Sequence, residues 1–582
     1  MPATIPSCHG RKEFDWLTGT TLGLWRWRGC CRNSWTTESD RMRVLRRAVP
    51  LETKRRRSCA GCACKSFGLI KTGPIKSKPK GNEMTRDARV RQVDRQDDRL
   101  RRMLALAREL AAERIAADAT YEMRQRAMSS VSADMMWLDE QEMLEELVAK
   151  DDRIEMDGVA YKKLAQPSSA TYHGLRGSHL IAEPLYRQEG LRNGPTIKPL
   201  EARAGMIAKH VLPDAARVFG LLSAYMTSTE IEMSLKEMGF DPPGRAFIEK
   251  RLKIMAGEIT EGAVELEEAA RASEVDIPAA AAISCGLDRM AVQMDEPLPQ
   301  GKTLPDRVPR KKPYARTPPP PAEHNWRMAW VGSMTEYDSD GNAIRTLRYG
   351  SDAGADRTGL ANRIIADANA TLARSPGAPV ICIQDGAKDL RALPEGLGAK
   401  LSDGDLAALP GQLGTALPAA PEIYHLTDFH HLMSYLDEVV RTCEPVGDPH
   451  NMKSWYRGEL LRDDGAIDRI LRNLRRRAKT VPAANKGART ALARAISYIR
   501  HRKKTMRYAS LHERNLPVGS GATESTCALM QLRVKRPGMA WKPPGLRGIM
   551  TIRGLVLSER WGPAWDAYAA GKIQHVNLAC AA

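Results

Sequence analysis

Three acidic residues in or beside apolar runs are the side chains of this chain best suited to chemistry. Asp288 follows the run 283–287, Asp385 follows the run 380–384, and Glu524 lies at the start of an expected helix. A carboxylate in an apolar run is costly unless it is paired or binds a cation. Two divalent cations about 3.5–4 Å apart can activate a water or hydroxyl and stabilise the leaving oxygen of a phosphodiester. The three acids therefore predict a Mg²⁺ (or Mn²⁺) site for phosphodiester chemistry.

The expected roles of the three acids follow from their elements. We expect Asp288, on a central strand, to bridge both ions, while Asp385 and Glu524 each complete one site. The alternative is that all three are ordinary acids at strand and helix ends. Asp295 competes with Asp288, but it lies an odd number of positions away and would point to the opposite face of a continuous strand.

A second polar cluster, Asp428-Phe429-His430-His431, follows another apolar strand. Asp428 is either a further metal ligand or a helix N-cap, and His431 either orients a carboxylate, contacts a phosphate or braces the fold. Capping and bracing are the favoured interpretation, because Asp commonly caps helices.

The elements that must position these residues have a recognisable order. A strand with Asp288 precedes a hairpin around 338–342, a helix at about 356–374, the strand before Asp385 and a strand at 423–426. This is the order of an α/β, ribonuclease-H-like catalytic core. We expect its first part at 271–442, a helical insertion at 443–515, a C-terminal helix region at 516–570 and a tail at 571–582.

The region upstream of the core is expected to bind DNA. Residues 1–95 read as a basic, poorly ordered extension, and 96–270 as a mainly helical region with β-hairpins. An apolar stripe over 100–111 predicts a packed helix face, or a seam between protomers. A helix, a glycine turn and a basic helix at 227–258 predict either a helix-turn-helix or two packed helices. Its candidate DNA-binding residues are Arg245, Lys250 and Arg251.

The charge of the whole chain indicates a polyanionic partner. The chain has 582 residues and a formal net charge of +19, and nucleic acid is the usual partner of such a protein. The alternative to a polyanionic partner is that the basic residues form an ordinary solvated surface. The insertion carries an arginine array that suits the phosphate backbone of double-stranded DNA, and three aromatic residues could stack on bases or pack in the core. These are Arg472, Arg475, Arg476 and Arg477, and Tyr498, Tyr508 and Trp541.

Other classes of protein are disfavoured. The sequence has no run of about 18 apolar residues, so no transmembrane helix is expected and a cytoplasmic location follows by default. The eleven cysteines are too dispersed for a disulfide framework. Cys59, Cys62 and Cys64 could bind zinc, but no second ligand pair follows at finger spacing, so free thiols are favoured.

Several motifs together resemble one family. The run 517–525, followed by 532–541, resembles the C-terminal motif of ISKra-type bacterial insertion-sequence transposases, which are distantly Mutator-like. Residues 384–387 resemble the second-aspartate motif of that family, 428–431 its aspartate-x-x-histidine element, and 286–297 its first-aspartate strand. The resemblance covers about residues 150–570.

The resemblance implies a DDE transposase that cleaves transposon ends and joins the freed 3′ hydroxyl to target DNA. It implies a ribonuclease-H-like core with a helical insertion. Asp288, Asp385 and Glu524 would be metal ligands and His431 an accessory catalytic residue. The implied partners are terminal inverted repeats, target DNA and a second copy of the chain, in the nucleoid of a bacterium. The competing hypotheses are an inactive DNA-binding descendant and a structure-selective, metal-dependent nuclease.

Overall fold

The computed structural model describes residues 98–166, 168–297, 322–354, 357–385, 421–443, 449–574 and 576–578. The chain divides into two units, Met1–Gln92 and Val93–Ala582, and every described residue belongs to the second unit. The expected basic extension over 1–95 and the cysteines Cys59, Cys62 and Cys64 lie outside the described residues.

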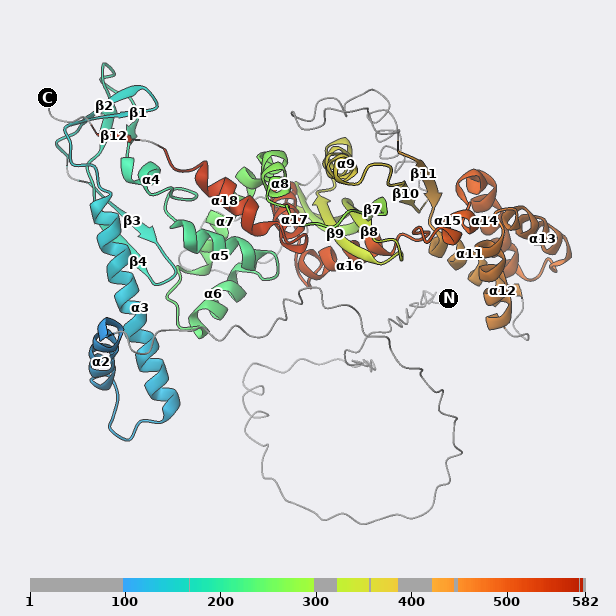
Figure 1. The fold of residues 1–582 in the computed structure, drawn as a ribbon, viewed down its shortest axis with the longest axis horizontal. Helices are drawn as coiled ribbons and strands as arrows, with labels where there is room; N and C mark the ends of the chain where they lie inside the picture. Colours follow the sequence, from blue (N-terminus) through green and yellow to red (C-terminus); the bar gives the residue numbers. More distant parts are fainter. Residues whose placement is uncertain are drawn as a thin grey trace, which may run out of the picture. The chain divides into compact units, whose positions relative to one another are not determined.

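A helical hairpin opens the described chain (Figure 1). It consists of α2 (Asp98–Ala112) and α3 (Tyr121–Glu146), with Thr120 accepting the Met123 amide as the N-cap of α3. The two helices bury only small residues against each other, namely Ala107, Ala111, Ala127 and Val131. The leucine and methionine residues of the apolar stripe over 100–111, which was expected to pack, are instead largely exposed.

A small antiparallel sheet follows the hairpin. Its strand order is β12-β1-β2-β5-β6, with bounds Val576–Leu578, Arg153–Met156, Val159–Lys163, Tyr186–Gln188 and Thr196–Ile197. A separate hairpin pairs β3 (Ser169–His173) with β4 (Ser178–Ala182). The β1–β2 and β3–β4 hairpins lie in the region where β-hairpins were expected. The segment expected as a tail supplies β12.

Five helices lead to the central sheet. They are α4 (Pro199–Arg203), α5 (Pro213–Ser223), α6 (Ser228–Glu237), α7 (Arg245–Glu261) and α8 (Ala263–Ala272). A capping box begins α6, because Thr227 accepts the Glu230 amide while Glu230 accepts the Thr227 amide. Gly239, at φ +86°, makes the turn between α6 and α7. The apolar face of α7 packs in one core with α5, α17 (Pro543–Leu557) and α18 (Trp561–Ala570).

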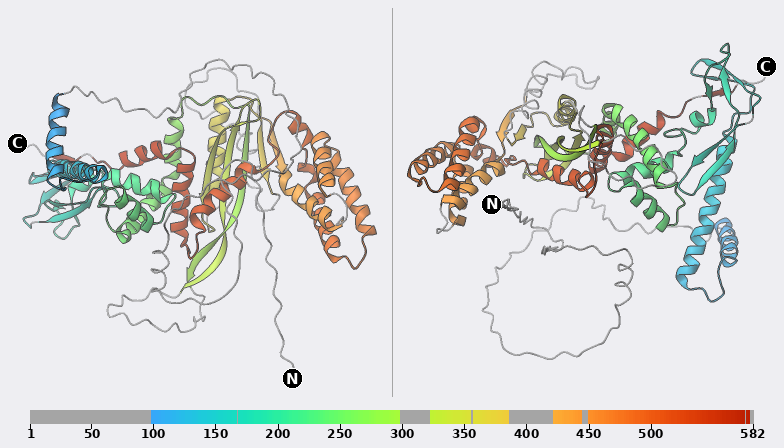
Figure 2. Two further views of the ribbon diagram at one scale, coloured as in Figure 1. Left: turned by 90° about the horizontal axis from the view of Figure 1, so that it is seen from below. Right: turned by 180° about the vertical axis from the view of Figure 1, so that it is seen from behind.

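The central sheet contains five strands in the order β11-β10-β7-β8-β9. They are β7 (Ala282–Pro297), β8 (Ala322–Tyr337), β9 (Ala343–Ser351), β10 (Val380–Gln384) and β11 (Ile423–Thr427). Strands β7, β8 and β9 form an antiparallel meander, whereas β10 lies parallel to both β7 and β11. Figure 2 shows how far the long β7–β8 hairpin extends.

Helices cover both faces of this sheet, so its strands are apolar on both sides. On one face α9 (Arg357–Arg374) packs against Ile283, Cys285 and Leu287. The other face carries α16 (Gly521–Val534) and α17 (Pro543–Leu557). Gly286 permits the close approach of α16, because a Cβ there would lie 2.0 Å from Thr523 Oγ1.

The segment between β11 and α16, called the insertion below, is helical. It follows α11 (Phe429–Cys443) and contains α12 (Pro449–Arg462), α13 (Ala466–Thr480), α14 (Lys486–Arg502), η3 (Lys503–Thr505) and α15 (Ala509–Glu513). Its apolar faces share a core with Ile381 and Ile383 of β10 and Leu426 of β11. The insertion is therefore packed directly on the parallel edge of the sheet.

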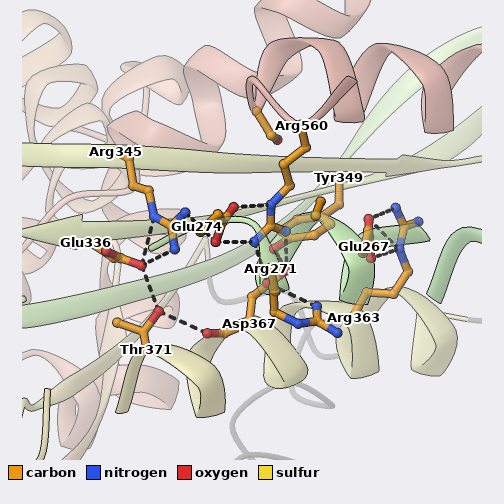
Figure 3. Close-up of polar contacts among 12 residues, drawn as sticks. Glu267, Arg271, Glu274, Glu336, Arg345, Tyr349, Arg363, Asp367, Thr371 and Arg560 are labelled. Atoms are coloured by element: carbon orange, nitrogen blue, oxygen red, sulfur yellow. Dashed lines mark hydrogen bonds and ion pairs between the residues drawn. The ribbon is translucent and has the colours of Figure 1, made fainter. Parts of the chain in front are cut away.

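A buried ion-pair network ties α18 (Trp561–Ala570) to the sheet (Figure 3). Arg560, just before α18, donates to both Asp367 on α9 and Glu274. Burial alone would lower the pKa of Arg560, but the bonds to Asp367 and Glu274 raise it. Arg345 continues the network from Glu274 to Glu336. Paired in this way, buried charges hold separate segments together.

Candidate functional site

The register of the parallel strands aligns three aspartates. Ile383 of β10 pairs with Gly286 of β7, and Gln384 pairs with Thr427 of β11. Continuing both registers to Asp385 places it level with Asp288 on one side and Asp428 on the other. Residues level with each other on parallel strands point to the same face, and neighbouring strands lie about 4.8 Å apart. That face is the one opposite α9, since Ile381, Ile383 and Leu426 lie in the core on that side.

Asp288 is half-buried, and both of its carboxylate oxygens have a partner. One carboxylate oxygen accepts the Arg289 amide at 2.7 Å, and the other accepts the Cys527 thiol at 3.5 Å. Burial raises the pKa of Asp288, and the charges of Asp385 and Glu524 raise it further. The three predicted acids therefore come from β7, from the end of β10 and from α16, and Asp385 and Glu524 both lie near enough to Asp288 to affect its pKa.

Glu524 reaches this site from the first turn of α16. Its side chain is exposed, and its Oε1 accepts the Ser520 hydroxyl at 3.0 Å. Ser520 occupies the N-cap position of α16, but its hydroxyl donates to Glu524 and accepts no helix amide. Cys527, one turn later on the same helix, contacts Asp288, so α16 carries Glu524 toward the middle of β7.

Asp385 directly follows the last paired residue of β10 and is half-buried. Its backbone carbonyl accepts the Tyr498 hydroxyl of α14 at 2.7 Å. A residue of the insertion thus contacts the backbone of the second candidate ligand.

Asp428 acts as a cap, which was the favoured interpretation. Its Oδ2 accepts the His431 amide at 2.7 Å at the start of α11, and its Oδ1 accepts the Ser520 amide at 2.7 Å. Asp428 is buried, and it joins α11 to the segment that begins α16. The His431 ring lies against Tyr435 and Tyr498, with centroids 5.5 and 5.7 Å apart.

Asp295 lies away from the aligned aspartates. Its amide donates to Trp541 O at 2.7 Å, and its carboxylate lies 3.8 Å from His324 Nδ1. The seven positions that separate it from Asp288 turn it to the other face of β7.

The donor set suits a hard cation, although the acids do not form a closed cage. Three carboxylates supply the oxygen ligands that Mg²⁺ and Mn²⁺ prefer, and their mutual repulsion is what a bound cation would relieve. Across the residues that the structure describes, no three His, Cys, Asp or Glu side chains are gathered closely enough to hold a metal ion. The carboxylates are neighbours without sharing one coordination shell.

The candidate DNA-binding arginines of α13 differ in exposure. Arg472, Arg475 and Arg476 are exposed, whereas Arg477 is half-buried and donates to Asn473 Oδ1 at 2.8 Å. The exposed arginines lie opposite the face that buries Ile467, Ile470, Leu471 and Leu474. The amphipathic pattern of α13 therefore separates a core face from a basic face.

The candidate helix-turn-helix residues on α7 also differ in exposure. Arg245 and Lys250 are exposed. Arg251 donates to Ala208 O at 2.7 Å, and its guanidinium lies 4.9 Å from the centre of the Phe247 ring. The contacts of Arg251 are therefore internal to the fold.

The aromatic residues considered for base stacking pack inside the protein. Tyr508 is fully buried and Tyr498 is 5% exposed. Trp541 donates from Nε1 to Val534 O at 2.9 Å, and its backbone bridges to Met294 of β7. The alternative of core packing is the correct one for both tyrosines, and Trp541 is an internal contact between β7 and α16.

Sequence reasoning missed three contacts at the site. They are the hydroxyl of Tyr498 on Asp385, the thiol of Cys527 on Asp288 and the ring of His430 against Gly519, where a Cβ would lie 2.5 Å from His430 Cδ2. The spacing of Cys527 from Glu524 was the one available signal, since residues three apart share a helix face.

Every helix in the described part of the chain is too short or too polar to cross a membrane. No protein-family model and no curated protein matches the chain. Among solved structures, a similarity is found to the Drosophila P element transposase strand transfer complex, with 12% sequence identity and a TM-score of 0.23. The alignment covers 63% of this chain and 82% of that one.

Proposed function

We propose that this protein is a DNA transposase that cleaves transposon ends and joins the freed 3′ hydroxyl to target DNA. The observation that carries the proposal is that Asp385 lies level with Asp288 on the neighbouring strand, while burial and then the charges of Asp385 and Glu524 raise the pKa of Asp288. Asp385 is 97 positions from Asp288 in sequence, and Glu524 a further 139 positions on. Such separations support a site assembled by the fold of the chain. Clustered carboxylates that repel one another favour a divalent cation as their partner.

The architecture supports a ribonuclease-H-like core as the framework of this site. Numbered in chain order, β7 to β11 give the spatial order 5-4-1-2-3, with the first three strands antiparallel and the fourth and fifth parallel to the first. The first and fourth strands are neighbours, so the acids that they carry are adjacent. A helical insertion precedes the helix with the third acid, as the motif resemblance implies.

Each residue of the site would have its own role in this reaction. Asp288, Asp385 and Glu524 would hold Mg²⁺ or Mn²⁺, which when bound activates the attacking oxygen and stabilises the leaving oxygen. The Arg289 amide and the Cys527 thiol hold the Asp288 carboxylate, and the Ser520 hydroxyl orients Glu524. Asp428 accepts the Ser520 amide and so holds the segment before α16 in place. The exposed arginines of α13 would contact the phosphate backbone of double-stranded DNA.

A second candidate is a DNA-binding protein without catalytic activity. It is favoured by one observation, that no described group of three potential ligands is close enough to hold a metal ion. The basic face of α13 would then act alone. A structure-selective nuclease is the third candidate, with the same acids but no strand joining.

Cleavage assays separate these candidates. Labelled DNA carrying the segments that flank the coding sequence would be incubated with the full chain and Mg²⁺ or Mn²⁺. A transposase cuts at the repeat ends and joins them to a target plasmid. Cutting of branched DNA regardless of end sequence would indicate the nuclease, and binding without cutting would indicate the inactive protein. Asp385→Asn should lower cleavage by a factor of about 10³ or more while end binding persists.

A further inference from the structure

Two tyrosines of the helical insertion contact the ends of the parallel strands. Tyr498 of α14 donates to Asp385 O at 2.7 Å, and Tyr508 donates to Thr427 O at 2.9 Å. Asp385 directly follows β10, and Thr427 is the last residue of β11. Two hydroxyls from one insertion therefore hold the ends of neighbouring strands.

We infer that Tyr498 is a positioning residue for the second candidate metal ligand, so that the insertion is part of the site. The inference rests on the proposed function, because it assigns Tyr498 a role toward Asp385. The last pairing in the ladder of β10 is that of Gln384 with Thr427. The Asp385 carbonyl lies beyond this ladder, and the Tyr498 hydroxyl donates to it, so it contacts the residue that carries the carboxylate.

The Tyr498 ring is itself held on several sides. It stacks on Tyr435 with centroids 4.4 Å apart and planes at 25°, and Arg502 lies 4.3 Å from its centre. The His431 ring tilts against it at 47°. Burial raises the pKa of Tyr498, so its hydroxyl stays protonated and can donate. His431 thereby acquires a place in the same arrangement, as packing for the tyrosine.

Tyr498→Phe removes one oxygen and keeps the ring, which makes it a narrow test. Mn²⁺ binding to the full chain would be followed by electron paramagnetic resonance, and cleavage by its dependence on Mg²⁺ concentration. We expect apparent metal affinity to fall about tenfold or more, as for other groups that orient metal ligands, with the melting temperature nearly unchanged. Tyr508→Phe is the matched control, because its partner Thr427 carries no candidate ligand, and its metal affinity should stay at the wild-type value.

Unchanged Mn²⁺ affinity and Mg²⁺ dependence in Tyr498→Phe would overturn the inference. Should the wild-type chain neither bind Mn²⁺ nor cleave, the proposed function fails, and hydrogen exchange then tests the contact. Faster exchange in the peptide that contains 380–385, in Tyr498→Phe but not in Tyr508→Phe, would still support a positioning role. Equal exchange in both would refute it.

A separate observation concerns the α2–α3 hairpin. Its buried core holds only Ala107, Ala111, Ala127 and Val131, while eleven large hydrophobic residues between Leu100 and Met143 are exposed. A patch of this kind marks an interaction surface. The charges of the hairpin are also divided. The exposed residues of α2 include Arg99, Arg101, Arg102 and Arg108, and those of the second half of α3 include Asp134, Asp139, Glu142, Glu145 and Glu146.

We propose that this hairpin pairs with the hairpin of a second copy of the chain. A two-fold arrangement sets the basic, leucine-rich α2 of each copy against the acidic, methionine-rich α3 of the other. Both the apolar surfaces and the charges are then matched, and four helices enclose a core that two cannot.

Light scattering of the full chain after size exclusion tests the pairing. We expect a dimer at micromolar concentration, a monomer for Arg102→Glu/Arg108→Glu, and a restored dimer when Glu142→Arg/Glu145→Arg is added. Leu191→Glu, at an exposed residue outside the hairpin, should remain dimeric. A monomeric wild-type chain, or a charge-reversed variant that stays dimeric, would refute the proposal.

Discussion

Two groups of arginines in this protein have opposite surroundings. In the C-terminal helices, Arg533 donates to Ser223 O at 2.8 Å and Arg553 donates to Leu529 O at 2.9 Å, and both are buried. On α13, Arg472, Arg475 and Arg476 are exposed. The guanidinium fork can satisfy several internal acceptors as readily as a phosphate. A high arginine content therefore indicates a nucleic-acid surface only where the apolar pattern leaves the arginines on the outer face.

The buried arginines also change how the C-terminal motif is understood. Arg536 donates to Glu230 and to Tyr225 O, which joins the end of α16 to the capping box of α6. Trp541, in the same motif, bridges to β7. Much of the stretch 532–541 therefore serves to hold the helix of Glu524 in place, and the acid itself accounts for only part of the motif.

Replacing a buried arginine should have the largest effect on stability. Arg560→Met leaves Asp367 and Glu274 without the guanidinium that pairs both, which should cost about 3–5 kcal/mol of unfolding free energy. Arg271 and Arg345 still contact these acids, so the lower end of that range is expected. Urea denaturation measures the loss. Arg472→Met on the exposed face should stay within about 0.5 kcal/mol of wild type, and equal losses would erase the distinction between the two groups.

Reversing charge on the exposed face should change DNA binding and leave stability alone. For Arg475→Glu/Arg476→Glu, the slope of log affinity against log salt should become shallower by about 1 for each phosphate that the variant no longer neutralises. Fluorescence anisotropy with duplex DNA over a salt series gives that slope. The matched variant Arg477→Glu changes a half-buried arginine on the same helix and should lower stability as well. An unaltered slope for the double variant would assign phosphate binding to another surface.

Removing the charge of Asp288 should cause the smallest change in folding stability of the three, and that change should depend on pH. The pKa of Asp288 is raised in the folded protein, so the folded state holds this proton more tightly than the unfolded state. Wild-type stability therefore falls as pH rises from the unfolded pKa through the folded one, and then levels. Asp288→Asn does not lose stability in this way, because an asparagine side chain does not titrate. Its melting temperature should exceed that of wild type at neutral pH, and the two should converge in acid, while cleavage is abolished. A gap that widens in acid would contradict the assigned shift.

The order of the elements could be predicted from the sequence, and most of the site could not. Apolar runs with turn residues between them indicated the strands that became β7, β10 and β11, and their order along the chain led to the expectation of a ribonuclease-H-like core. The register of β10 against β7 decides whether Asp288 and Asp385 are level, and no local pattern specifies it. The Asp428 cap was readable, because its partner lies three residues away.

Contacts to backbone carbonyls were beyond sequence reasoning. Tyr498 and Asp385 are 113 residues apart, and Arg533 and Ser223 are 310 apart. A carbonyl is present at every residue, so the identity of the acceptor leaves no trace in the sequence. The exposed hydrophobic residues of α2 were misjudged for a related reason, since the stripe reveals an apolar face without its partner.

The pairing of β12 with β1 bears on how the protein is made and handled. Met156 lies opposite Val576, so a sheet begun early in translation lacks one strand until residue 578 has left the ribosome. Chains broken before Val576 expose the β1 edge, which invites sheet-to-sheet aggregation. A fusion partner placed close behind β12 would crowd that pairing.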